Sequence, residues 1–339
     1  MAVAVDGRRG HVFVVNQGSD TVTILDARTG QTVATVRVGI TPTAVAVDGV
    51  TGRAFITLGS GNGGRVGIIN TQSGAFLHAV AVGAGPIAAA VDEQTGHAFV
   101  VSGGVVACPL RSICRHTSGS SVSMLDARTG TVLHTVALAS GTNPWSIAVD
   151  TGTSHAFVTS LIGSVIVLDT RSGCILRTVR VAQNAGDLSV DRRIGRVFVL
   201  HRGNARNDDS SVSMLDAHSG RVLHVTRVGR GSSAIDVSEQ TGHVFVTNGT
   251  DSSVSVLDAG SNLLVRTITV AQGPSAVVVA ERTGKVYVAS ADVSNGMNSD
   301  ISRESGLPDR VATTLRNGIR TLRQGRTGSV SVIDVNIKH

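Results

Sequence analysis

The chain has few aromatic residues, almost no lysine and little cysteine, and each shortage limits what it can be. Aromatic residues make up 3% of the 339 residues, with one tryptophan and one tyrosine, so the core must be built from small and branched aliphatic side chains. Only Lys285 and Lys338 are lysines, and arginine therefore supplies most of the net charge of +6. No apolar run of about 18 residues occurs, so we expect no membrane-spanning helix.

Glycine and alternating apolar residues are abundant instead. The chain contains 40 glycines and 41% hydrophobic residues, and helical periodicity is absent from nearly all of it. Period-two alternation is clear in "HVFVVN" (His11–Asn16) and "SVSVLD" (Ser253–Asp258), as expected for strands with two different faces. The composition predicts many short strands joined by glycine turns.

A repeat of propeller-blade length runs through the whole chain. Segments of the "AVAVD" type begin near residues 2, 44, 88, 146, 187, 234 and 276, so most units are 41 to 47 residues long. Each unit reads as four strands, and a unit of this size cannot bury its own faces. The sequence therefore predicts an all-β, single-domain, seven-bladed β-propeller over residues 1–339, with four-stranded antiparallel blades.

Two segments also resemble a known repeat family. "VFVTNGTDSSVSVLD" (Val244–Asp258) and "VFVVNQGSDTVTILDARTG" (Val12–Gly30) are similar to the YVTN-repeat propellers, and related segments recur in every blade. The resemblance implies the propeller fold and a bacterial surface or periplasmic binding protein. More distant propellers of this kind include lactonases and a streptogramin lyase, which leaves an enzymatic role open.

A basic residue begins the second strand of every predicted blade, and an acidic or amide residue ends the third. Antiparallel pairing places these positions side by side, so we expect each basic side chain to pair with an acidic or amide neighbour. Because histidine, arginine and lysine interchange here, the column predicts a repeated structural pair rather than a metal or catalytic site. The basic residues are His11, Arg53, His97, His155, Arg196, His243 and Lys285.

The long insertions all fall between the second and third strands of a blade. They comprise residues 103–120, 202–210 and 291–328, and strand alternation places them on one face of the ring. Variable loops on a rigid scaffold commonly carry binding sites. We therefore expect the ligand or partner surface on this face, which we call the variable face.

Candidate binding residues are those that depart from the repeat near the central tunnel on this face. Asp187 and Asp236 replace small residues of the innermost strands, where carboxylates could bind a polar ligand or hydrogen-bond to the tunnel backbone. A role in acid–base or metal-assisted hydrolysis is also open, but no motif identifies a catalytic residue, a metal site or a cofactor. The full candidate set is Asn143, Trp145, Asp187, His201, Arg202, Arg230, Asp236 and Asn248.

These features favour a non-catalytic binding or scaffold propeller whose partner is a small molecule or a protein. The first alternative is a propeller hydrolase or lyase acting on a lactone-like small molecule. The second is DNA binding through the arginine-rich face, which we do not favour because no basic cluster has interleaved aromatic residues. We expect a monomer.

Three local features complete the prediction. Cys108 and Cys114 share one insertion and can form a disulfide in an oxidising compartment. The spacing of apolar residues in 309–325 predicts a short amphipathic helix, with a flexible loop as the alternative. The seventh blade ends after its third strand, so we expect it to lack its outer strand and to expose an edge.

The start of the chain bears on localisation. A propeller commonly closes with a strand from its N-terminal segment, and Met1 begins directly at an innermost strand. The true start could therefore lie upstream of Met1, and a signal peptide would then precede the missing strand. In that case the protein is periplasmic or extracellular.

Overall fold

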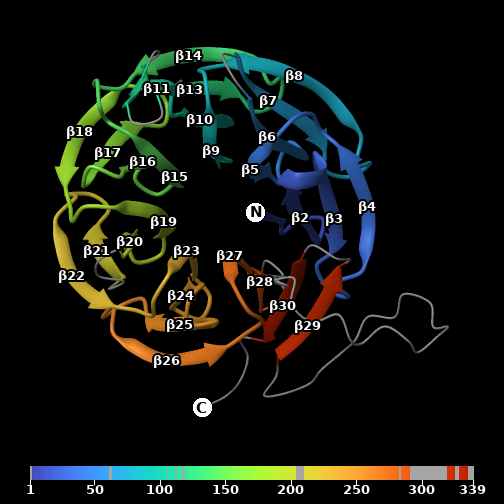
Figure 1. Cartoon of the computed structure of the whole chain (residues 1–339), viewed down its shortest axis with the longest axis vertical. Helices are drawn as coiled ribbons and strands as arrows, with labels where there is room; N and C mark the ends of the chain where they lie inside the picture. The colour runs from blue at the N-terminus through green and yellow to red at the C-terminus, as the bar shows by residue number, and fades with distance from the viewer. Residues whose placement is uncertain are drawn as a thin grey trace.

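The computed structural model describes residues 2–60, 63–104, 106–110, 113–116, 119–203, 210–281, 284–290, 319–324 and 328–334. In these ranges the strands form seven four-stranded antiparallel sheets and one two-stranded hairpin. Figure 1 shows the four-stranded sheets arranged around a central axis, each with one edge strand innermost and the other at the rim. The fold is an all-β propeller of four-stranded antiparallel blades, as the sequence predicts.

Six blades follow chain order from the centre outward. Their strands are β1 (Ala2–Asp6), β2 (His11–Asn16), β3 (Thr21–Asp26) and β4 (Thr32–Arg37); β5 (Pro42–Asp48), β6 (Arg53–Ser60), β7 (Gly63–Asn70) and β8 (Phe76–Val82); β9 (Pro86–Asp92), β10 (His97–Ser102), β13 (Ser121–Asp126) and β14 (Val132–Ala137); β15 (Pro144–Asp150), β16 (His155–Ser160), β17 (Ser164–Asp169) and β18 (Ile175–Arg180); β19 (Ala185–Asp191), β20 (Arg196–His201), β21 (Ser211–Asp216) and β22 (Val222–Arg227); β23 (Ser232–Ser238), β24 (His243–Asn248), β25 (Ser253–Asp258) and β26 (Leu264–Thr269). A short 3₁₀ helix, η1 (Gln17–Ser19), joins β2 to β3.

The seventh blade has a different strand order. Its strands are β27 (Pro274–Ala280), β28 (Lys285–Ser290), β29 (Ile319–Gln324) and β30 (Gly328–Asp334), in the order β27-β28-β30-β29. The outer strand β29 comes from the insertion and pairs antiparallel with β30. Two predictions were therefore wrong: the blade has an outer strand, and residues 319–324 are extended rather than helical. The rest of the predicted helix lies outside the described residues.

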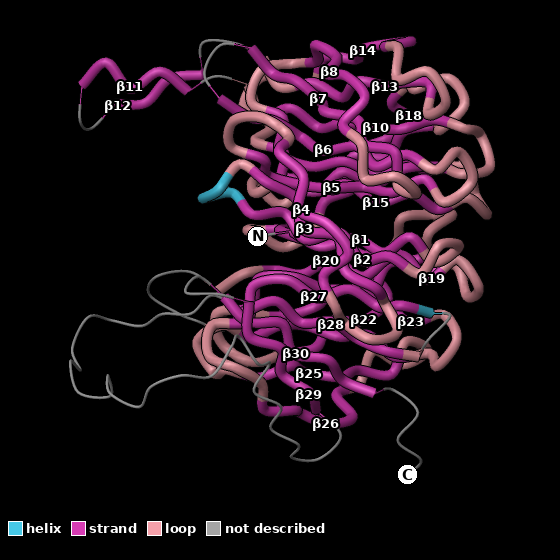
Figure 2. Tube along the Cα trace, turned by 90° about the vertical axis from the view of Figure 1, so that its right-hand side faces the viewer, coloured by secondary structure: helices cyan, strands magenta, loops and turns pink. Residues whose placement is uncertain are grey.

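The insertion in the third blade forms a hairpin. Strands β11 (Val106–Leu110) and β12 (Ile113–His116) pair antiparallel, and Ala107 is opposite Arg115. Figure 2 shows this hairpin projecting from one side of the ring, whereas short turns cover the opposite side. We call that opposite side the turn face. Cys108 and Cys114 belong to the two hairpin strands, but their side chains lie outside the described residues, so the disulfide remains a prediction.

The core is made of apolar layers between neighbouring blades. Each second strand contributes one buried aromatic ring to these layers, and a separate cluster of buried residues lies between each pair of adjacent blades. The cluster that joins the last blade to the first contains Val12, Leu25 and Ala27 together with Ala280 and Tyr287. The buried rings are Phe13, Phe55, Phe99, Phe157, Phe198, Phe245 and Tyr287.

The basic column has the expected backbone register, but most of its described contacts differ from the prediction. Arg196 forms the predicted ion pair with Asp216, with 3.1 Å between Nη1 and Oδ2. His11 and His97 instead place Nδ1 3.0 and 2.9 Å from backbone carbonyls of the next blade. The third-strand carboxylates are engaged in their own turns: Asp26 Oδ1, for example, accepts the backbone N–H groups of residues 28 and 29. His11 and His97 therefore join blades rather than strands.

No helix in the described ranges is long and apolar enough to cross a membrane.

Candidate functional site

Asp187 and Asp236 lie on the neighbouring innermost strands β19 and β23 but two residues out of step, because Asp187 corresponds to Ala234 and Asp236 corresponds to Ser189. Both side chains are partly exposed, whereas their chain neighbours in these strands are mostly buried. Alternation along a strand directs every second residue to the same face, and on the innermost strand that face borders the central channel. The sequence therefore located these two carboxylates correctly with respect to the strands.

Asp187 connects three adjacent blades. Ser146 on β15 donates its hydroxyl hydrogen to Oδ1 over 2.7 Å, and the backbone N–H of Leu188 donates to the same oxygen over 3.0 Å. The other oxygen, Oδ2, accepts the N–H of Ile235 on β23 at 3.3 Å. Both carboxylate oxygens are thus used within the ring.

Asp236 repeats this arrangement one blade further on. Its Oδ1 accepts the hydroxyl of Ser189 at 3.0 Å and the N–H of Val237 at 2.9 Å. Its Oδ2 accepts the N–H of Val279 on β27 at 2.8 Å. Together the two aspartates link the innermost strands of the fourth to seventh blades, which is the structural alternative considered from the sequence. Ser146 and Ser189 were not predicted, because a serine on a strand carries no sequence signal for this role.

Loss of solvation raises the pKa of both carboxyl groups. For Asp236 burial raises the pKa to about 6, although hydrogen bonds from Val279, Ser189 and Val237 act in the opposite direction. For Asp187 burial also raises the pKa, while the hydroxyl of Ser146 and the positive charge of Arg202 lower it. The channel therefore contains at least one carboxyl group that titrates near neutrality.

Trp145 and Arg202 meet at the mouth of the channel on the variable face. The guanidinium carbon of Arg202 lies 5.0 Å from the centroid of the Trp145 ring, within the range of a cation–π contact. A Cβ at Gly186 would come within 2.9 Å of Arg202 Cδ, so the glycine makes room for the arginine stem. Trp145 is 39% exposed, and Ile162, in the turn between β16 and β17 of the same blade, is 60% exposed. The sequence predicted Trp145 and Arg202 but not Ile162.

His201 and Asn248 are equivalent residues at the ends of β20 and β24, and both are buried. His201 Nε2 lies 2.8 Å from Ser213 Oγ, and burial lowers the pKa of the imidazole. Asn248 Nδ2 donates to Ser253 Oγ at 3.0 Å and Ser255 Oγ at 2.9 Å. These side chains fill the same place in two blades and join the second strand to the third.

Asn143 and Arg230 lie in the links that lead into innermost strands. Asn143 has a positive φ of 45°, and glycines occupy the matching position of three other blades. The left-handed backbone at this position therefore accounts for the asparagine. Arg230 is paired with Asp251: its Nη2 lies 2.9 Å from Oδ1, and its backbone N–H donates to Oδ2 at 2.8 Å. The equivalent glycines are Gly85, Gly231 and Gly273.

Five of the eight candidate residues thus separate into two sets. Trp145, Asp187 and Arg202 form one cluster at the channel mouth, whereas His201 and Asn248 serve inter-strand contacts inside their own blades. Within the described ranges, no group of three or more His, Cys, Asp and Glu side chains is arranged to hold a metal ion.

Comparisons with known proteins agree with this architecture. A family model described as "Outer membrane protein assembly factor BamB" matches residues 118–302, which is more than half of the chain. Among solved structures, Kuenenia stuttgartiensis hydrazine synthase is similar, with a TM-score of 0.70 and 16% sequence identity over 85% of this chain and 92% of that chain. At this identity the likeness shows the fold. No curated protein sequence matches the chain.

Proposed function

This chain belongs to the family of propellers described as outer membrane protein assembly factor BamB, and we propose that it is a non-catalytic propeller that binds a protein partner. The contact surface in this proposal is the variable face around Trp145, Ile162 and Arg202. An assembly factor acts by binding other proteins, so the family description supports a protein partner. We propose, further, that the repeats are of the YVTN type and that the protein works in the periplasm or outside the cell.

The observation that carries this proposal is the exposed pair of Trp145 and Arg202. Tryptophan and arginine are the residue types that most often dominate the energy of protein–protein contacts. Trp145 is the only tryptophan in the chain, yet 39% of it is exposed, and Ile162 adds an aliphatic side chain that is 60% exposed. An aromatic and an aliphatic residue on a rigid scaffold, bordered by a guanidinium group, can anchor a protein partner.

The charge of the variable face indicates the chemistry of that partner. Among residues with described side chains, arginines outnumber aspartates at the strand ends on this face, and one aspartate is already paired with Arg230. An acidic segment with apolar side chains would complement both the charge and the exposed rings. The arginines are Arg37, Arg65, Arg180, Arg202, Arg227 and Arg230, and the aspartates are Asp20 and Asp251.

The channel carboxylates support binding over catalysis. Each oxygen of Asp187 and Asp236 already accepts a hydrogen bond from a neighbouring strand or serine. These hydrogen bonds occupy acceptor positions that a general base or a metal ligand would need for its own chemistry. Asp187 and Asp236 therefore serve as structural links between the innermost strands.

Calorimetric titration tests the proposal with a random copolymer of glutamate and tyrosine as an acidic, aromatic probe, at physiological salt. Arg202→Ala and Ile162→Ser should each weaken binding by about fivefold or more. Leu133→Ser is the matched control, because Leu133 is 50% exposed on the outer strand β14 and should leave the affinity unchanged. Tighter binding to duplex DNA than to the copolymer would instead support the nucleic-acid alternative, and unchanged affinity in both variants would refute the assigned surface.

The pKa of Asp236, about 6, is the one observation that favours a hydrolase as second candidate. A carboxyl group that titrates near neutrality at the border of a channel suits general acid–base catalysis on a lactone-like molecule. Turnover of a simple lactone that is lost in Asp236→Asn but kept in Asp258→Asn would support this candidate over the binding function.

A further inference from the structure

A pocket of about 520 Å³ lies between the outer strands of the first two blades, which Figure 1 shows at the rim of the ring as β4 and β8. Five of its six lining residues come from the variable-face end of the first blade, and the sixth is the first residue of β8. The volume is within the range of small-molecule sites. The lining residues are Asp20, Arg37, Val38, Gly39, Ile40 and Phe76.

Phe76 gives this pocket an aromatic wall that the repeat does not supply elsewhere. In the six blades that follow chain order, no other outer strand begins with an aromatic residue. A Cβ at Gly67 of β7 would come within 2.8 Å of Phe76 Cε2, so this glycine makes room for the ring. Phe76 is nevertheless 39% exposed. The residues that correspond to Gly67 in the other blades are Thr23, Ser123, Ile166, Ser213, Ser255 and Ser331.

Ile40 adds an aliphatic wall in the link between β4 and β5. It is 65% exposed, the largest exposed fraction of any large hydrophobic side chain in the described ranges. Four other blades have links of the same length, and none of them has a large apolar residue at this position. Phe76 and Ile40 therefore form an apolar surface that the packing of the ring does not require. The corresponding link residues are Ala84, Gln183, Arg230 and Gln272.

One charge of each sign lies beside this apolar surface. Arg37 is the last residue of β4, and Asp20 directly precedes β3, its partner strand. The N–H of Val38 donates to the carbonyl of Asp20 at 3.1 Å, which places the two charged residues next to each other. Asp20 Oδ1 accepts the N–H of Thr41 at 2.9 Å, so its carboxylate is held in place. Arg37 is exposed and forms no ion pair with the described residues.

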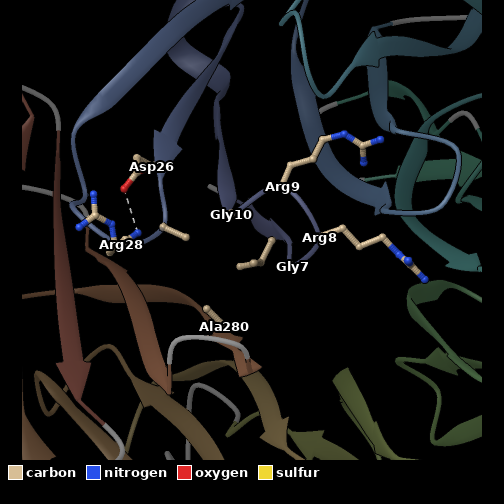
Figure 3. A pocket seen from close by; sticks show the side chains of 9 residues that line it. Gly7, Arg8, Arg9, Gly10, Asp26, Arg28 and Ala280 are labelled. Carbon is tan, nitrogen blue, oxygen red and sulfur yellow. Dashed lines mark hydrogen bonds between the residues drawn. The ribbon is translucent and has the colours of Figure 1, made fainter.

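A smaller pocket of about 320 Å³ on the turn face lacks this combination (Figure 3). In the part of the chain that the structure describes, its lining has no aromatic residue, and its apolar side chains are Val5, Ala27 and Ala280. Arg28 borders it with an exposed side chain. This pocket offers charge without a large apolar surface, which makes Arg28 the matched control for Arg37.

We propose that the pocket between the first two blades, the rim pocket, binds a free α-amino acid with a large apolar side chain. The carboxylate of the ligand pairs with the guanidinium group of Arg37, and its ammonium group pairs with the carboxylate of Asp20. Its side chain packs against Phe76 and Ile40 and removes their apolar surface from water. The site belongs to the first two blades and does not depend on the partner surface around Trp145.

Calorimetric titration of the full chain with L-phenylalanine tests this proposal. The wild type should bind this amino acid at a single site. 3-Phenylpropionate lacks the ammonium group and phenethylamine lacks the carboxylate, so each should bind about tenfold more weakly. L-Serine keeps both charges but has no apolar side chain, and it should also bind about tenfold more weakly.

Three variants replace a pocket residue with the residue that another blade has at the same position, so we expect the fold to be kept. Arg37→Thr should weaken the binding of L-phenylalanine about tenfold but should not weaken that of phenethylamine, which has no carboxylate for the guanidinium group. Phe76→Val and Ile40→Gln should each weaken the binding of L-phenylalanine about threefold or more. Arg28→Ala should leave the affinity unchanged.

Three results would overturn the proposal. The first is a wild type that does not bind L-phenylalanine. The second is equal affinity for 3-phenylpropionate and L-phenylalanine, because the contact with Asp20 would then contribute nothing. The third is an equal loss of affinity in Arg28→Ala and Arg37→Thr, which would indicate a general effect of charge. Ile40→Gln changes an exposed link and keeps the test usable if Phe76→Val does not fold.

Discussion

The hydroxyl group of Tyr287 donates a hydrogen bond to the backbone carbonyl of Ala27 and so connects the seventh blade to the first. The other six blades have phenylalanine at this position, and the tyrosine therefore marks the closing junction. Lys285 makes a second contact there, because its Nζ donates to the carbonyl of Arg28 at 2.6 Å. The ring closes through these side chains and their apolar cluster, and the outer strand of the seventh blade comes from its own insertion.

Replacing Tyr287 with phenylalanine should weaken this closure. The variant keeps the buried ring but removes the donor, which leaves the Ala27 carbonyl without it. We expect the free energy of unfolding in urea to fall by about 0.5–1.5 kcal/mol. Val33→Ser changes a side chain that is 55% exposed, and it should shift the same quantity by less than about 0.5 kcal/mol. Equal stability of Tyr287→Phe and wild type would show that the hydrogen bond does not contribute to closure.

Alkaline pH should act on the same group. Burial raises the pKa of Tyr287 to about 12 from an ordinary value of 10.0, so the unfolded chain loses this proton first. The stabilisation that depends on the protonated hydroxyl is complete below pH 10 and declines as the pH rises toward 12. The stability difference between wild type and Tyr287→Phe should therefore shrink over this interval. A difference that is constant with pH would contradict the assignment.

Asp236 should make the stability of the wild type depend on pH between about 4 and 6. Its pKa is about 6 in the folded protein and 3.8 ordinarily, so the folded state binds the proton more tightly. The contribution of this carboxyl to stability is full below pH 3.8 and declines as the pH rises through about 6. Asp236→Asn should flatten the profile of Tm against pH over this interval.

Asp258 is the control of opposite sign. Hydrogen bonds from the hydroxyl and the N–H of Ser261 hold the pKa of Asp258 below its ordinary value. Its contribution is present above the ordinary pKa and is lost as the pH falls, so Asp258→Asn should remove part of the loss of stability in acid. If both variants change the profile in the same direction, the pKa of Asp236 is not raised by burial.

Gly130 should be far less replaceable than Gly10. Both have positive φ, at 79° and 69°, so an alanine at either position costs about 1–2 kcal/mol in backbone strain. A Cβ on Gly130 would also overlap Ile68 Cδ1 of the preceding blade, whereas a Cβ on Gly10 meets nothing within 4 Å. Gly130→Ala should therefore destabilise the protein by about 1–3 kcal/mol more than Gly10→Ala in urea unfolding. Equal losses would mean that the terminal methyl group of Ile68 can move away from this position at little cost.

The repeat allowed much of this molecule to be predicted from sequence, because each column recurs in blade after blade. The repeat predicts the strand positions and the single face that carries the insertions. It also places Asp187 and Asp236 on innermost strands. The outer strand β29 could not be found, since it lies in an insertion and pairs against chain order. The partners of His11 and His97 were missed because they are backbone carbonyls of another blade, which carry no side-chain signal. The same holds for the bonds from Ser146 and Ser189.

The fluorescence of Trp145 tests the central claim most directly, because it is the only tryptophan and 39% of it is exposed. Saturation with the glutamate–tyrosine copolymer, excited beyond tyrosine absorption, should shift its emission to shorter wavelength as the ring leaves water. The Arg202→Ala variant should need a concentration of the copolymer about fivefold higher or more to give the same emission shift. Calorimetric saturation with an unchanged emission spectrum would place the bound partner elsewhere and contradict the account.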